Sequence, residues 1–283
     1  MRQTIKKVVK YTGVAVVAFF FLFPVYWLVI TAFKYPEEWF QWPPIIIPIN
    51  LTLDNFFGLK GGVYGHLTTS VANITPYLIN STVVGMVTAL VSTAIAASAA
   101  YAISRYKIGG MRFVSWIISI RMLPPIAAAL PLYIIFMRLH LLNTWWALIL
   151  SYLLLTTPLS CWILLTFFNE IPGEMDEAAQ VDGCSPFKAF VYVILPLSAP
   201  GLAAVATLSF IACWGEFLLA LILTSNQQAQ TLPIFLGRYI TGWRIAWGPL
   251  SAAGIINMVP VIIFSLIMQR YLIRGLTFGA VKG

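Results

Sequence analysis

The chain has 283 residues, of which 60% are hydrophobic and 9% are charged. Soluble domains ordinarily contain ~45–50% apolar and ~25% charged residues. A soluble fold of this length would have too few charges to cover its apolar surface, and the mean hydropathy of +0.88 agrees. The composition therefore excludes a soluble enzyme, a disordered chain and a secreted disulfide scaffold. It predicts a polytopic membrane protein.

Six stretches are long and apolar enough to cross ~30 Å of hydrocarbon as helices. They lie at about 13–33, 77–101, 113–137, 146–168, 201–223 and 249–270. The first follows a basic N-terminus but is too long for the core of a signal peptide, which favours a retained helix. The sequence therefore predicts an all-α fold with six transmembrane helices in one permease domain, residues 1–283.

The basic residues predict the orientation of these spans, because cytoplasmic segments are enriched in Lys and Arg. With the N-terminus inside, the inner segments contain Arg2, Lys6, Lys7, Lys10, Arg105, Lys107, Arg112, Lys188, Arg270, Arg274 and Lys282. The outer segments contain Lys34, Lys60, Arg138, Arg238 and Arg244. Both termini are therefore expected inside, with outer loops at 34–76 and 224–248, an inner loop at 169–200 and an inner tail at 271–283.

The inner loop has the sequence pattern of two short helices. Acidic residues follow Pro172, as is typical of a helix N-terminus, and Gly183 is a natural C-terminal stop. Ser185 and Pro186 are a typical N-cap and first position of a second helix, which we expect to end at Leu195–Pro196. Its apolar face is predicted to contain Phe187, Phe190, Val191 and Ile194. We call residues 174–195 the elbow; its apolar face could dock on a partner or pack under its own bundle.

The segment Glu177–Gly183, followed after ten residues by Ile194–Leu197, resembles the EAA loop of ATP-binding-cassette (ABC) importer permeases. Three other segments resemble the maltose-type, MalG-like branch of these carbohydrate permeases. They are Arg121–Pro125 with Pro131–Tyr133, Leu51–Phe56, and the tail Gly275–Gly283. The resemblance covers nearly the whole chain and implies a type I ABC importer permease fold in the bacterial cytoplasmic (inner) membrane.

The resemblance also implies partners. These are two ATPase subunits, which would hold ATP and magnesium, a second, MalF-like permease subunit, an extracytoplasmic solute-binding protein, a sugar and membrane lipid. This chain contains no phosphate-binding GxxxxGK[ST] loop, so we expect it not to be an enzyme and to hold no cofactor, metal or nucleic acid. The residues implied in ATPase coupling are Glu177, Ala178, Ala179, Asp182, Gly183, Phe187, Ile194, Leu195 and Pro196.

Polar and aromatic side chains supply further candidates. Arg121 and Glu216 lie inside predicted spans, where a charge costs roughly 2.5–3.5 kcal/mol and should face protein or water. Each could belong to the transport pathway or to a structural network; Trp214 and Tyr133 are further pathway candidates. Gln227, Gln228, Tyr239 and Trp243 in the last outer loop are candidates for contact with the binding protein. A four-residue stripe of small side chains, Gly85, Ala89, Thr93 and Ala97, indicates close helix packing.

The leading hypothesis is thus a permease subunit of an ATP-driven sugar importer. The alternative is an ion-coupled secondary transporter, which would need coupling carboxylates inside the spans, where Glu216 is the one available. An intramembrane enzyme would need a nucleophile with a base, or metal ligands, at membrane depth, and the sequence shows neither arrangement.

Overall fold

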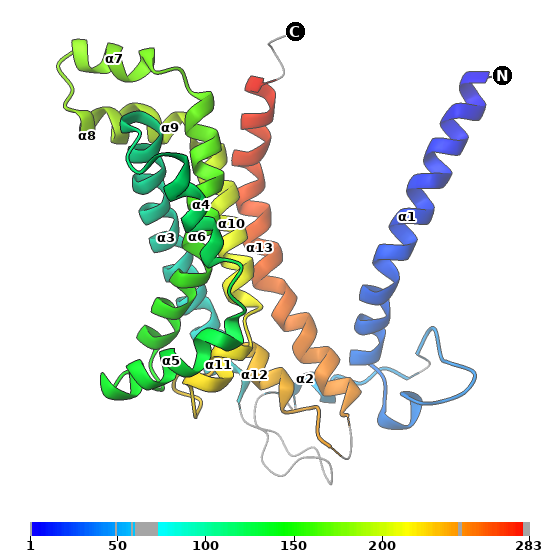
Figure 1. The fold of residues 1–283 in the computed structure, drawn as a ribbon. Helices are drawn as coiled ribbons and strands as arrows, with labels where there is room; N and C mark the ends of the chain where they lie inside the picture. Colours follow the sequence, from blue (N-terminus) through cyan, green and yellow to red (C-terminus); the bar gives the residue numbers. More distant parts are fainter. Residues whose placement is uncertain (1, 49, 58, 60–72, 243–244, 280–283) are drawn as a thin grey trace. The chain divides into compact units, whose positions relative to one another are not determined.

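The computed structural model describes all residues except 1, 49, 58, 60–72, 243–244 and 280–283, and the described chain is mainly helical (Figure 1). The elements are α1 (Arg2–Ala32), η1 (Pro36–Glu38), α2 (Asp54–Phe57), α3 (Ile74–Tyr106), α4 (Gly110–Ile120), α5 (Pro125–Arg138), α6 (Trp145–Glu170), α7 (Glu174–Val181), α8 (Pro186–Ala189), the π-helical segment η3 (Phe190–Ile194), α9 (Leu195–Leu197), α10 (Ala199–Trp214), α11 (Leu218–Leu223), α12 (Leu232–Gly237) and α13 (Trp247–Gly279). The chain divides into two compact units, residues 1–75 with 235–259 and residues 76–234 with 260–283.

Membrane-spanning helices account for most of the described chain. Four helices are long and apolar enough to span: Val9–Ala32, α3, α6 and Trp247–Tyr271. Two bent helix pairs raise the number in the described chain to six if each counts as one span. They are Arg112–Ile120 with Pro125–Arg138, and Pro186–Leu197 with Ala199–Trp214. This result confirms the predicted all-α membrane fold, whereas the third and fifth spans differ from the continuous helices that we expected.

The third predicted span is broken at residues 121–124. Helix α4 ends at Ile120, α5 begins at Pro125, and the two are bent by 82°. Pro124 and Pro125 explain the break, because each lacks an N–H and disfavours a helical conformation in the residue before it. Pro124 is accordingly extended, with ψ 133°.

The fifth predicted span, 201–223, is also interrupted. Helix α10 begins at Ala199 and ends at Trp214, and the separate helix α11 starts at Leu218. The Glu216 carboxylate accepts hydrogen bonds from the backbone N–H groups of Leu219 and Ala220, at 2.9 and 3.1 Å. An acidic side chain in this position caps a new helix, which explains why the chain restarts here.

The stripe of small residues on α3 packs against another helix of the same unit. Ala89 and Ala97 are buried, and a side chain at Gly85 would lie 3.2 Å from the ring of Phe210 on α10. The stripe therefore serves close helix packing, as the small side chains predict, and it does so within the chain.

Gly201 marks another close approach, between α10 and α6. A Cβ atom there would lie 2.7 Å from the ring of Phe167. We expect Gly201→Val to lower the free energy of unfolding by about 1–3 kcal/mol, because the ring must move to admit the side chain. Gly13→Val is the matched control, since a Cβ at Gly13 meets nothing within 4 Å. Equal unfolding midpoints for both variants in detergent would contradict the prediction.

Polar contacts group the loops of the second unit at its two ends. At one end, the Asn143 Oδ1 accepts from the N–H groups of Ser225 and Asn226. At the other end, the Ser104 hydroxyl donates to Asn169 over 2.7 Å, so the turn after α3 lies beside the elbow. The elbow and α11 lie at opposite ends in Figure 1. The assignment of these two ends to the inner and outer sides of the membrane stays a prediction.

In the first unit, the segment Leu51–Phe56 is joined to the end of α1 by hydrogen bonds from Asn55. The amide of Asn55, which is fully buried, donates to the carbonyl oxygens of Ala32 and Lys34, at 2.9 and 3.0 Å. Ala32 is the last residue of α1, where backbone acceptors lack helical partners, and Lys34 lies two residues beyond it. Asn55 therefore caps the first span.

Candidate functional site

The first helix of the elbow, α7, forms as the sequence predicts. Glu174, Asp176 and Glu177 occupy its first turn. At its C-terminal end, the N–H of Gly183 donates to Gln180 and that of Cys184 donates to Ala179, which is the hydrogen-bond pattern of a Schellman motif. Gly183 has a φ of +88°, a conformation that glycine adopts without strain. The predicted stop at Gly183 is confirmed.

The second helix also begins as predicted but ends later. The Ser185 hydroxyl accepts from the N–H of Lys188, and Pro186 is the first helical residue. The helix then widens into the π-helical segment η3 and continues through Leu195–Leu197, so Pro196 does not end it. The N–H of Leu195 donates to the carbonyl of Phe190, five residues earlier, which is the π-helical pattern. A new helical turn then begins, and Pro196 is tolerated in it because the first residues of a helix do not need an N–H donor.

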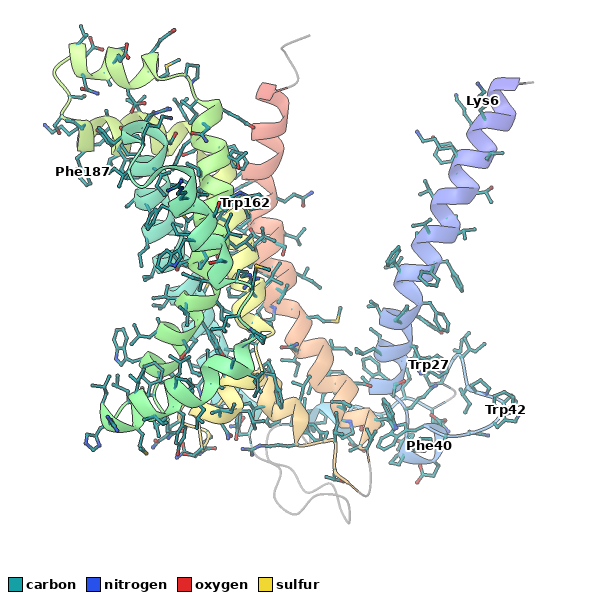
Figure 2. All side chains as sticks on the ribbon, in the orientation of Figure 1. Lys6, Trp27, Phe40, Trp42, Trp162 and Phe187 are labelled. Atoms are coloured by element: carbon teal, nitrogen blue, oxygen red, sulfur yellow. The ribbon has the colours of Figure 1, made fainter. Side chains whose placement is uncertain are left out.

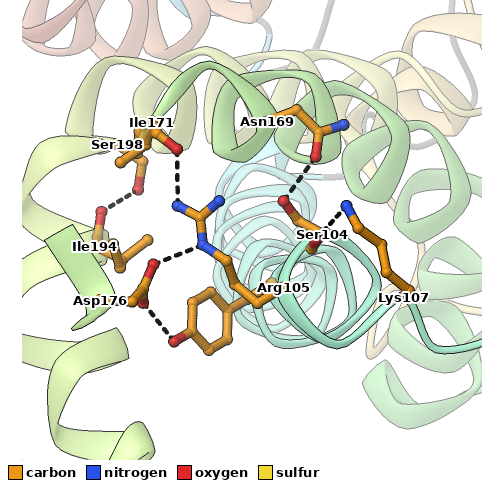
Figure 3. Close-up of polar contacts among 9 residues, drawn as sticks. Ser104, Arg105, Lys107, Asn169, Ile171, Asp176, Ile194 and Ser198 are labelled. Carbon is orange, nitrogen blue, oxygen red and sulfur yellow. Dashed lines mark hydrogen bonds and ion pairs between the residues drawn. The ribbon is translucent and has the colours of Figure 1, made fainter. Parts of the chain in front are cut away.

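Asp176 joins the elbow to the end of α3 (Figure 3). One carboxylate oxygen accepts from the Arg105 Nε at 2.6 Å, and the other accepts from the Tyr101 hydroxyl at 2.7 Å. Arg105 also donates to the carbonyl of Ile171, the residue directly after α6, at 2.9 Å. The Asp176 and Arg105 side chains are 8% and 15% exposed. A buried, charge-assisted network thus connects α7, α3 and α6.

The apolar residues of the second helix divide between two environments. Phe190 and Ile194 are buried in a core that contains Tyr101 and Phe168, with the Tyr101 and Phe190 rings 4.6 Å apart. Phe187, by contrast, is 73% exposed and projects from α8 (Figure 2). One side of the elbow therefore packs on its own bundle, and another is left uncovered by this chain.

The residues predicted to couple to the ATPase differ in their exposure to solvent. Six are exposed, namely Glu177, Ala178, Asp182, Gly183, Phe187 and Pro196, and Leu195 is half-buried. Ala179 and Ile194 are 7% and 0% exposed. Their small or apolar side chains fill the interface between the elbow and its own bundle, and a part of these two residues in a partner contact stays a prediction.

Sequence reasoning missed the network of Asp176, Arg105 and Tyr101. The sequence explains Asp176 as an acid at a helix N-terminus and Arg105 as a basic residue of a cytoplasmic segment. Neither explanation requires a contact between the two residues. The sequence did contain one signal for this contact, because Asp176 and the basic turn with Arg105 were both predicted on the inner side. The two residues are some seventy positions apart in the sequence and form a hydrogen bond in the structure.

Arg121 lies at the break between α4 and α5 rather than inside a continuous span. Its guanidinium donates to the carbonyl of Leu155 at 2.8 Å, three residues before Pro158 in α6. Proline disturbs the carbonyls one turn before it, so Arg121 satisfies backbone near a weakened turn. It also borders a cavity of about 10 Å³ beside Thr156 and Ser160, a size that suits one water molecule.

The other intramembrane candidates lie in packed surroundings. Glu216 caps α11, and the hydroxyl of the buried Tyr152 faces its carboxylate. Trp214 is 3% exposed and packs on Phe210 with ring centroids 5.3 Å apart. Its ring thus fills space between helices, and its role on the pathway stays a prediction. Tyr133 is half-buried against the core around Phe136 and remains a pathway candidate.

The outer-loop candidates also differ from one another. Gln227 and Gln228 are exposed, and the Gln228 side chain accepts from the Asn143 amide at 3.4 Å. Tyr239 is 6% exposed and packs edge-on against Phe235, and its contact with the binding protein stays a prediction. Burial raises its pKa to about 12. Trp243 lies outside the described residues.

Comparison with known proteins agrees with these features. The family described as "Binding-protein-dependent transport system inner membrane component" matches residues 92–278. The trehalose/maltose transport system permease protein MalG of Thermococcus litoralis is 33% identical over 99% of both chains. The trehalose transport system permease protein SugB of Mycobacterium tuberculosis is 39% identical, covering 84% of this chain and 85% of SugB.

A solved structure shows the same fold. It is a crystal structure of a bacterial ABC transporter that imports the acidic polysaccharide alginate, with a TM-score of 0.74 and 19% identity. The match covers 96% of this chain and 98% of that one. The predicted importer permease fold is confirmed, and so is the prediction of a transport component rather than an enzyme. The chain belongs to the family of inner membrane components of binding-protein-dependent transport systems.

Proposed function

We propose that this chain is the transmembrane subunit of an ATP-driven importer that moves a sugar or oligosaccharide across the cytoplasmic membrane. A second permease subunit would complete the pathway, and two separate ATPase subunits would supply the energy. An extracytoplasmic solute-binding protein would deliver the substrate. ATP and magnesium would be held by the ATPases.

The observation that carries the proposal is the elbow, which is firmly attached to the bundle on one side and exposed on the other. Asp176 ties α7 to α3, while Phe190 and Ile194 are buried in the bundle. Phe187 and Val181 are 73% and 87% exposed, and apolar groups in such positions are typical of a partner interface. Movement of an ATPase bound there would be transmitted to α3 and α6 as rigid-body motion.

The sugar class is supported by relatives whose names refer to trehalose, maltose and diacetylchitobiose transport. Selectivity would be shared with the binding protein. In this subunit, the exposed Gln227 and Gln228 are candidates for contact with the binding protein, and Tyr133 is a candidate on the pathway.

Uptake in proteoliposomes tests the proposal. The complex of this chain with its second permease and ATPases is reconstituted, and labelled trehalose, maltose and diacetylchitobiose are offered with the binding protein. We expect uptake of at least one sugar that needs internal ATP and external binding protein and is insensitive to a protonophore. Uptake driven by an ion gradient without ATP would instead favour the secondary-transporter hypothesis.

A further inference from the structure

Arg121 lies close to the middle of the membrane, at the break in the third span. Its guanidinium donates to the carbonyl of Leu155 at 2.8 Å. Leu155 comes ten residues after the start of α6 at Trp145 and fifteen before its end at Glu170. At about 1.5 Å per residue, it lies about 15 and 22 Å from the two ends of this helix. The guanidinium is therefore held near the midplane of the bilayer.

Lipid does not suit this break. Residues 121–127 are all exposed on this chain, and the backbone between Ile120 and Pro125 is not helical. Irregular backbone inside the hydrocarbon layer is tolerated where protein buries it or where it lines a water-filled cavity. A charged side chain at this depth likewise needs protein or water around it. The exposed side of the break, with Arg121, therefore faces water or another protein.

The described chain supplies no carboxylate to Arg121. All nine acidic residues belong to the described chain, and the salt bridge found among them joins Asp176 to Arg105. A guanidinium has five N–H donors, and the Leu155 carbonyl accepts from one of its nitrogens. Arg121 therefore keeps donors for a group that comes from outside this chain.

Buried hydroxyl groups make the surroundings of Arg121 polar. Thr156, Ser160 and Ser209 line a cavity of about 10 Å³ together with Arg121. The Ser160 hydroxyl lies 3.1 Å from that of Ser209 and accepts from that of Ser92 at 3.4 Å. A cavity of this size holds one water molecule where polar groups surround it. A protein that covered the guanidinium would have to satisfy its donors and offset its charge, whereas water does both. The surroundings therefore favour a water-filled pathway.

We propose that Arg121 lines the substrate pathway at mid-membrane and donates hydrogen bonds to hydroxyl oxygens of the sugar as it passes. A sugar that leaves bulk water must regain hydrogen bonds for its hydroxyl groups, and the fork of a guanidinium supplies several donors from one position. This inference rests on the proposed function and adds to it a residue that contacts the substrate.

Cysteine accessibility tests where Arg121 lies. Arg121→Cys is made in a Cys184→Ala background, because the other native cysteines, Cys161 and Cys213, are buried. The complex with the second permease and the ATPases is reconstituted in proteoliposomes. A charged, membrane-impermeant methanethiosulfonate, which reacts with thiols in water and not in hydrocarbon, is added during ATP-driven uptake. We expect it to label position 121.

Val17→Cys is the control, at an exposed apolar position of the first span, and it should stay unlabelled. If Arg121→Cys does not assemble, Met122→Cys decides in the same way, because Met122 is 82% exposed at the same break. Labelling at the break that is no faster than labelling at Val17→Cys would overturn the proposal, since lipid or the second permease would then cover the break.

Uptake measurements test the contact with the sugar. Arg121→Met keeps a long side chain but removes the donors. We expect it to lower the ratio of sugar taken up to ATP hydrolysed by roughly 10-fold, the effect of one charge-assisted hydrogen bond. Arg121→Lys keeps a charged donor and should restore part of this ratio.

A wild-type ratio in an assembled Arg121→Met complex, or equal losses in both variants, would contradict the contact. Loss of assembly in Arg121→Met would show a structural role instead and would contradict it as well. Wild-type uptake that needs ATP and binding protein tests the proposed function by itself. Failure of the variants to behave as expected therefore tells against the role of Arg121 alone.

Discussion

Asp176→Ala is expected to uncouple ATP hydrolysis from transport, because it removes the carboxylate that ties the elbow to α3 and α6. Breaking a buried ion pair costs about 3–5 kcal/mol. Here we expect about 3 kcal/mol, since Arg105 keeps its bond to the carbonyl of Ile171 and is partly solvated. The elbow should still bind the ATPase through its exposed residues, so ATP hydrolysis continues. The movement of the ATPase is then no longer transmitted to the membrane spans.

The measurement is the ratio of sugar taken up to ATP hydrolysed by the reconstituted complex. Glu174→Ala is the matched control, because it removes an exposed acid from the same first turn of α7. Tyr101→Phe deletes one hydrogen bond to Asp176 and should have a smaller effect, about 1 kcal/mol on stability. A normal ratio in an assembled Asp176→Ala complex would refute the role of the network, whereas loss of assembly would show that Asp176 is needed only for folding.

The elbow could be predicted from the sequence because its determinants are local. A Schellman motif needs a residue at positive φ, which points to Gly183, and an N-cap needs a hydroxyl one residue before Pro186. These signals act within a single turn, so they do not depend on the rest of the fold. The network around Asp176 does depend on it, because Arg105 is some seventy residues away and only the packed bundle brings the two together.

The interrupted spans show a second limit. Hydropathy over 113–137 and 201–223 detects apolar residues but not whether the helix is continuous. Pro124 with Pro125 stops one helix by removing donors, a signal that was present in the sequence. Glu216 restarts the other through hydrogen bonds to Leu219 and Ala220, which a hydropathy profile cannot show.

Burial was the property that the sequence left open. Phe187, Phe190 and Ile194 share a predicted apolar face, and the sequence allowed both docking on a partner and packing under the bundle. The structure shows the packing, because Phe190 and Ile194 are buried in the bundle. It leaves Phe187 exposed, and docking through this residue stays a prediction. Similarly, Trp214 and Tyr239 were chosen as candidates for the pathway and for a binding-protein contact because they are aromatic. Their burial is visible only in the structure.

Phe187→Asp is expected to release the ATPase subunits while leaving the fold of this chain intact. Its side chain is 73% exposed, so the substitution removes little packing within the chain. Exposed aromatic residues at the centre of an interface commonly contribute about 2–4 kcal/mol, which corresponds to roughly 30–1,000-fold weaker association. Co-purification of the ATPases and their sedimentation with proteoliposomes measure the loss.

Phe190→Asp is the informative comparison, because it makes the same chemical change three residues along the same helix. Phe190 is 7% exposed and packs against Tyr101, so a carboxylate there would be buried without a partner. Truncating a buried Phe costs about 3–5 kcal/mol, and burying a charge adds to this, so Phe190→Asp should lower the unfolding midpoint of the isolated chain. Phe187→Asp should leave that midpoint unchanged. If Phe187→Asp kept the ATPases bound at wild-type strength, the exposed side of the elbow would not be the docking surface. The proposal that the ATPase moves the spans through this surface would then be refuted.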